Sequence, residues 1–107
     1  MGQSETIQQI AFKIIADAGA AKSLAVEALT FAKKEEIDRA NAMLDEAREH
    51  FNEAHRHHLG LIQDEAKGNK IELNLIFMHA EDQLMSTETI LLLIEEMIDM
   101  YQTIQRS

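Results

Sequence analysis

The chain has 107 residues, a length that predicts a single domain spanning 1-107. It contains no proline and only four glycines, which favours an all-α fold, and no cysteine, which excludes disulfides and thiolate chemistry. The formal net charge of −9 argues against nucleic acid and anionic membrane surfaces as partners.

Two weak points divide the chain into three predicted helices. The first lies at 30–35, where Lys33 and Lys34 suit the end of one helix, and Glu35 and Glu36 suit the start of the next, through the helix dipole. The second lies at 67–70, where Gly68 is expected to end a helix and Asn69 to be a turn or N-cap residue. Three helices of about 30 residues each predict an elongated, antiparallel up-down-up bundle.

Apolar residues in the first two predicted helices alternate spacings of three and four, which is the seam of a helical bundle. In the first helix the seam consists of Ile7, Ala11, Ile14, Ala18, Ala21, Ala25, Ala28 and Ala32. In the second it consists of Ile37, Ala40, Leu44, Ala47, Phe51, Ala54, His58 and Leu61. His58 therefore occupies a position where an apolar residue is expected.

The third predicted helix carries two apolar stripes on nearly opposite faces. One stripe contains Ile71, Leu75, Met78, Asp82, Met85, Thr89 and Leu92. The other contains Leu73, Phe77, Ala80, Leu84, Leu91, Ile94, Ile98 and Tyr101. A helix that is apolar on two faces is buried on two faces, so we expect copies of the chain to associate through this helix around one symmetry axis.

His79 lies between these two stripes, with Gln83 one turn on and Ser86 two turns on along the same strip. An imidazole is nucleophilic at neutral pH, and Gln83 and Ser86 offer hydrogen-bond donors to phosphoryl oxygens. No basic residue lies within a turn of His79, so charge neutralisation has to come from elsewhere. Spacing alone favours the plainer interpretation that His79 is a tolerated polar residue at a helix edge.

Asp82 lies among apolar residues of the first stripe. A lone buried carboxylate is costly unless it is paired or binds a metal. Three copies meeting at a threefold axis would bind a cation such as magnesium, and the alternative is an ion pair with a basic side chain from another helix. The residues alone leave these two interpretations equally open.

Four histidines cluster in the second predicted helix: His50, His55, His57 and His58. Such a set is able to bind zinc, but the chain has neither cysteine nor an HExxH pattern. The favoured interpretation is that His57 is solvated. His55 and His58 are expected to face the bundle or a neighbouring subunit, near His79.

The segment from His79 to Ser86, HAEDQLMS, resembles the phosphoacceptor segment of a known family. This family is the IIA component of the lactose/cellobiose (N,N'-diacetylchitobiose) class of the phosphoenolpyruvate-dependent sugar phosphotransferase system, with the pattern His-(Ala/Gly)-Gln-Asp-His-Leu-Met-Thr. Residues 18–23 and 27–29, AGAAKS and EAL, resemble the family's Ala-Gly-x-Ala-Arg-Ser and Glu-Ala-Leu segments. The resemblance covers nearly the whole chain.

The resemblance implies a phosphotransferase component whose three-helix subunits form a homotrimeric nine-helix bundle. It implies that His79 accepts a phosphoryl group from HPr and passes it to a cysteine of the cognate IIB protein. IIB then phosphorylates a lactose-, cellobiose- or chitobiose-type sugar carried by the membrane component IIC. It also implies that Asp82 from three subunits surrounds a structural Mg²⁺ on the trimer axis.

Two departures from the family pattern lie beside His79. Gln83 replaces a frequent second histidine, and Glu81 replaces the usual glutamine, which is expected to put a carboxylate next to the phosphoryl group. Two competing interpretations need no phosphoryl transfer: a structural or adaptor bundle, and a metal sensor built on the helix-two histidines. The resemblance favours the phosphocarrier.

The sequence also bears on localisation. Residues 1–5 are polar and show no signal-peptide hydrophobic segment. No apolar run approaches the roughly 20 residues of a membrane span. We therefore expect a cytoplasmic protein without direct membrane insertion.

Overall fold

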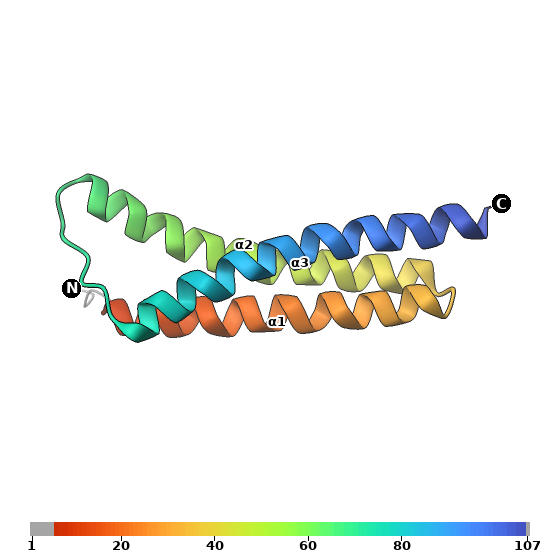
Figure 1. Ribbon diagram of the computed structural model, residues 1–107, viewed down its shortest axis with the longest axis horizontal. Helices are drawn as coiled ribbons and strands as arrows, with labels where there is room; N and C mark the ends of the chain where they lie inside the picture. Colours follow the sequence, from red (N-terminus) through yellow and green to blue (C-terminus); the bar gives the residue numbers. More distant parts are fainter. Residues whose placement is uncertain (1–5, 107) are drawn as a thin grey trace.

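Three long helices make up the fold (Figure 1). The computed structural model describes residues 6–106, which form α1 (Ile7–Lys33), α2 (Ile37–Ala66) and α3 (Leu75–Gln105). The helices run up, down and up along a body of 55 × 24 × 22 Å, so the predicted all-α bundle is confirmed. No helix in the described part of the chain is long and apolar enough to cross a membrane. Residues 1–5, which entered the localisation argument, lie outside it.

The turn between α1 and α2 closes without glycine. α1 ends at Lys33, and Glu35 adopts a left-handed conformation with φ of 67°. The Glu35 N–H donates to the carbonyl of Ala32 at 3.0 Å, and the Glu36 N–H donates to that of Phe31 at 3.0 Å. These bonds satisfy carbonyls that the helix end leaves unpaired, and the predicted break is confirmed.

The turn after α2 uses the predicted glycine. Gly68 has φ of 96°, a conformation that side chains disfavour, and Asn69 donates its N–H to the carbonyl of Asp64 at 3.1 Å. Gly68 thus ends α2 and Asn69 is a turn residue, as expected.

The start of α3 differs from the prediction. The predicted stripes began at Ile71 and Leu73, but α3 begins at Leu75, because the Asn74 side chain accepts a hydrogen bond from the Phe77 N–H at 2.8 Å. This N-cap fixes the first turn of α3. Ile71 and Leu73 therefore lie in the connecting loop, and their assignment to the helix was wrong.

The helix α1 holds the bundle together. It packs extensively against both other helices, whereas α2 and α3 meet over a much smaller surface. Figure 1 shows the C-terminal end of α2 standing apart from α1 and from the start of α3. The predicted α1 seam is buried from Ala11 to Ala32, and its six alanines allow the neighbouring helices to approach closely.

The two faces of α3 have different environments. The inner face is buried and contains Phe77, Ala80, Leu84, Thr87, Leu91, Ile94 and Ile98. Thr87, which was not assigned to either stripe, is fully buried and donates its hydroxyl to the carbonyl of Ala18 at 3.4 Å. The outer stripe is exposed and includes Leu75, Met78, Met85 and Leu92. One chain therefore covers only one of the two apolar faces.

Candidate functional site

His79 is the fifth residue of α3, and its side chain is exposed. Its neighbours Phe77 and Ala80 are buried against α1 and α2, which turns the intervening position outward. The N-cap at Asn74 fixes the turn from which the imidazole projects. The ring is therefore held on a rigid helix and remains accessible to a macromolecular partner.

Gln83 and Ser86 follow His79 along the same face and are half-buried. The Ser86 hydroxyl donates to the carbonyl of Asp82 at 2.7 Å, so its hydrogen is used within α3. The Gln83 carbonyl oxygen Oε1 accepts a hydrogen bond from Lys22 Nζ at 3.5 Å. Gln83 remains able to donate through its amide group, whereas Ser86 in this conformation is not a free donor.

Lys22 is a basic residue that sequence reasoning did not bring to the site. It comes from α1, 61 positions before Gln83, and so is not among the residues within a turn of His79 along α3. One signal pointed to it: Lys22 occupies the position of the arginine in the Ala-Gly-x-Ala-Arg-Ser pattern. The structure thus brings an ammonium group to Gln83, which lies one turn from the candidate phosphoacceptor.

Glu81 does not lie on the His79 side of α3. Its carboxylate Oε1 pairs with His58 Nε2 of α2. Two residues along a helix correspond to about 200° of rotation, so Glu81 faces α2 while His79 faces outward. The expectation that Glu81 puts a carboxylate beside the phosphoryl group was wrong. The same pair explains how the polar His58 side chain, only 16% exposed, is accommodated in the α2 seam.

The α2 histidines His55 and His50 have contacts of their own. His55 is exposed and stacks on the Phe51 ring at a centroid distance of 6.0 Å. His50 Nδ1 lies 3.1 Å from Asp17 Oδ1 of α1. Within residues 6–106, no group of three or more histidine, cysteine or acidic side chains could hold a metal ion. A single chain therefore lends no support to the metal-sensor interpretation.

Asp82 lies in the middle of the exposed stripe, between Met78 and Met85, which are 58% and 66% exposed. Its carboxylate forms no ion pair with any side chain in the described part of the chain. A basic partner from another helix, the alternative to a metal for this residue, is thus absent from residues 6–106. Carboxylate oxygens suit Mg²⁺, and in one chain this stripe contributes a single carboxylate, that of Asp82.

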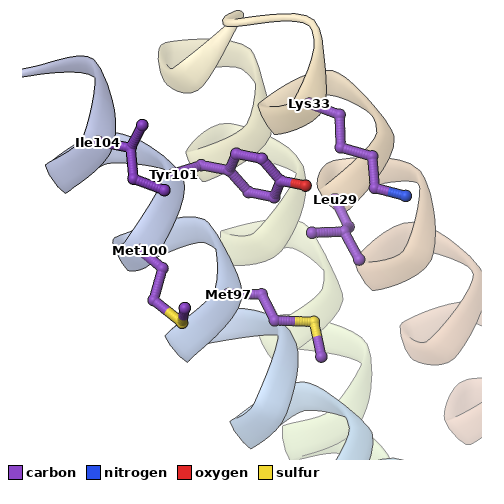
Figure 2. Close-up of a pocket in the computed structure, with 6 residues that line it drawn as sticks. All are labelled: Leu29, Lys33, Met97, Met100, Tyr101 and Ile104. Carbon is purple, nitrogen blue, oxygen red and sulfur yellow. The ribbon is translucent and has the colours of Figure 1, made fainter.

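A pocket of about 360 Å³ lies near the end of the bundle farthest from His79, between α1 and the last turns of α3. It is lined by Leu29, Lys33, Met97, Met100, Tyr101 and Ile104. Figure 2 shows Tyr101 reaching from α3 toward Leu29 and Lys33 of α1, with Met97 and Met100 on the same helix as Tyr101. It contains no histidine or carboxylate, so it is no candidate for phosphoryl transfer.

Known proteins match this chain over most of its length. The family model for the lactose/cellobiose-specific IIA subunit of the PTS system matches residues 9–102. The lichenan-specific phosphotransferase enzyme IIA component of Bacillus subtilis (strain 168) is 38% identical over 101 residues, covering 94% of this chain and 92% of that protein.

Two solved structures have the same fold. The PTS cellobiose-specific enzyme IIA from Bacillus anthracis matches with a TM-score of 0.91 and 39% identity, covering 98% of this chain and 96% of that one. The Escherichia coli IIA(chitobiose) protein, solved in complex with HPr, matches with a TM-score of 0.82 and 32% identity, covering 95% and 99%. This chain belongs to the lactose/cellobiose-specific IIA family of the sugar phosphotransferase system. Members of this family act as phosphocarriers.

Proposed function

We propose that this protein is a cytoplasmic phosphocarrier in which His79 accepts a phosphoryl group from phospho-HPr and donates it to the cysteine of a IIB protein. The transfer serves uptake of a lactose-, cellobiose- or chitobiose-type sugar through a membrane IIC component. The observation that carries the proposal is the exposed imidazole of His79, at the histidine of the family-like segment. HPr is proposed as donor because the IIA(chitobiose) relative was solved in complex with it.

The chemistry needs only one nitrogen lone pair. The unprotonated ring nitrogen of His79 attacks the phosphorus of the donor phosphohistidine, and a new N–P bond forms as the donor N–P bond breaks. The donor imidazole leaves with the electron pair, and each ring keeps the hydrogen on its other nitrogen, so no proton has to be lost. Positioning and electrostatics dominate such transfers, which suits a residue fixed on a rigid helix.

The donor and the acceptor use one surface in turn, because both must reach the same nitrogen. The half-buried Ile76, three residues before His79 and outside the exposed stripe, supplies apolar contact area at this surface. Complexes built on such a small rim are expected to be transient, as a carrier requires.

The exposed stripe of α3 supports a homotrimer. Three chains packed around one axis would bury this stripe and complete a nine-helix bundle. The three copies of Asp82 would then meet and hold one Mg²⁺, whose positive charge would offset their repulsion. In this proposal the ion stabilises the assembly and does not act on the phosphoryl group.

The alternative is a structural or adaptor bundle without chemistry. It accounts for the seams and for the exposed stripe, but it leaves unexplained why an imidazole projects from α3 at the position of the family's phosphoacceptor. The phosphocarrier hypothesis accounts for the exposed stripe and for the imidazole. It requires His79, whereas a structural bundle does not.

Intact mass spectrometry distinguishes the phosphocarrier from the structural bundle. The protein is incubated with phosphoenolpyruvate, enzyme I and HPr, and we expect one acid-labile phosphate on wild type and none on His79→Ala. His55→Ala, which removes another exposed histidine, serves as the matched control and should gain phosphate like wild type. Phosphate on none of the three proteins would contradict the proposal, and so would phosphate on His79→Ala.

A further inference from the structure

Lys22 contacts the residue one turn from the proposed phosphoacceptor: its Nζ lies 3.5 Å from Oε1 of Gln83. We propose that Lys22 is a phosphoryl-binding residue, which rests on Gln83 in the free protein and moves to the phosphoryl oxygens once His79 is phosphorylated. The inference rests on the proposed function, and it names the positive charge that the α3 segment itself lacks.

The charge of the molecule makes such a residue necessary. The chain already carries a formal net charge of −9, and a phosphoryl group adds roughly two more negative charges. Three arginines, Arg39, Arg48 and Arg56, are paired with carboxylates. The hydrogen-bond partner of Lys22 is instead a neutral amide oxygen. Within residues 6–106 its charge is therefore not neutralised by a carboxylate, and it is available to an arriving anion.

The distances suit an exchange of partners. A contact of 3.5 Å is at the upper limit for a hydrogen bond, so little is lost when it breaks. Gln83 is four residues from His79, or about 6 Å along the helix axis, and the flexible four-carbon stem of lysine can span part of that distance. The stem is half-buried between α1 and α3, which keeps the ammonium close to the site.

The exchange has a second consequence for Gln83. While Lys22 is bound, the amide presents its oxygen to the ammonium and its donor group away from it. Once Lys22 moves, Gln83 is free to turn its NH₂ group toward the same phosphoryl oxygens. Lys22 and Gln83 would then act together, and the phosphorylated state would gain a charge-assisted hydrogen bond that the free state lacks.

The test is the equilibrium of phosphoryl exchange with HPr, measured by intact mass of both proteins. We expect Lys22→Gln to lower the equilibrium constant about tenfold, the size of a lost charge-assisted bond. Lys22→Arg, which keeps the charge, should stay within about twofold of wild type. Lys33→Gln removes the same charge from the same helix, about 16 Å further along, and should have no effect.

Each outcome is decisive. An equilibrium constant for Lys22→Gln equal to that of wild type would overturn the role of Lys22 while leaving the phosphocarrier intact. An equally large loss in Lys22→Arg would also overturn it, because packing and not charge would then be responsible. A wild-type protein that accepts no phosphate would sink the proposed function, and this inference with it.

A measurement on the unaltered protein guards against variants that fold poorly. NMR of the lysine side chains follows the Nζ and Cε signals of Lys22 as the protein is phosphorylated. We expect the Lys22 signals to shift and those of Lys33 to stay in place. Unchanged Lys22 signals in the fully phosphorylated protein would contradict the exchange of partners.

Discussion

At the residue scale, Glu81 and His58 explain each other. The sequence placed a carboxylate near the phosphoacceptor and a histidine in an apolar seam, and each position looked unfavourable by itself. In the structure the two side chains pair across α2 and α3, at 33% and 16% exposure. Glu81 departs from the family pattern and His58 from the apolar seam, so we interpret the two residues as one matched pair. Their contribution is to the contact between helices and not to phosphoryl transfer.

Substituting Glu81 tests this separation. We expect Glu81→Gln to leave phosphorylation of His79 unchanged and to lower the free energy of unfolding in urea by about 0.5–1 kcal/mol, the size of one side-chain hydrogen bond. Glu88→Gln, an exposed carboxylate on the same helix, is the control and should change neither quantity. A severalfold change in phosphoryl acceptance by Glu81→Gln alone would show that the carboxylate acts at the site after all.

The position of Lys22 beside Gln83 could not be predicted from the sequence. His79, Gln83 and Ser86 share one helix, so the turn of the helix placed them on one face from the sequence alone. Lys22 reaches the same place across the packing of α1 against α3. The seam shows which face of each helix is buried, but not how far one helix is shifted along the other. That shift decides which side chains meet.

At the element scale, the end of a helix was predicted correctly where the residue that ends it has a strong conformational preference. Gly68 ends α2 because it readily adopts the left-handed conformation. Glu35 adopts the same conformation in the connection between α1 and α2, where no glycine or asparagine predicted it. The start of α3 was misplaced because Ile71 and Leu73 continue the apolar pattern into the loop. Only the cap at Asn74 separates them from the helix.

The exposed stripe of α3 makes a prediction about assembly. Met85 is 66% exposed in one chain, and in the proposed homotrimer it is buried near the axis. We expect Met85→Glu to give monomers, because three uncompensated carboxylates would have to be buried together. Leu59→Glu introduces the same charge on α2, where the side chain is 43% exposed, and should leave the trimer intact.

Light scattering after gel filtration measures the mass of each variant. A trimeric mass for wild type and Leu59→Glu with a monomeric mass for Met85→Glu is the expected result. Association that survives Met85→Glu would place the interface elsewhere and leave this face of α3 for another partner.

At the scale of the whole molecule, the fold followed from the seams. Two alternating three-four patterns and one doubly apolar helix predicted an up-down-up bundle, and the helices are arranged in this way. The dominance of α1 was not predicted. It follows from its alanines, which let both neighbours approach closely, while α2 and α3 meet over a smaller surface.

The central claim is that His79 is the phosphoacceptor, and trypsin tests it most directly on the unaltered protein. Cleavage after Arg48, Arg56, Lys67 and Lys70 separates the five histidines into three peptides, and His79 is the only histidine of residues 71–106. After incubation with phosphoenolpyruvate, enzyme I and HPr, digestion at neutral pH should leave the phosphate on that peptide alone. Phosphate on residues 49–56 or 57–67, or on no peptide, would contradict the account.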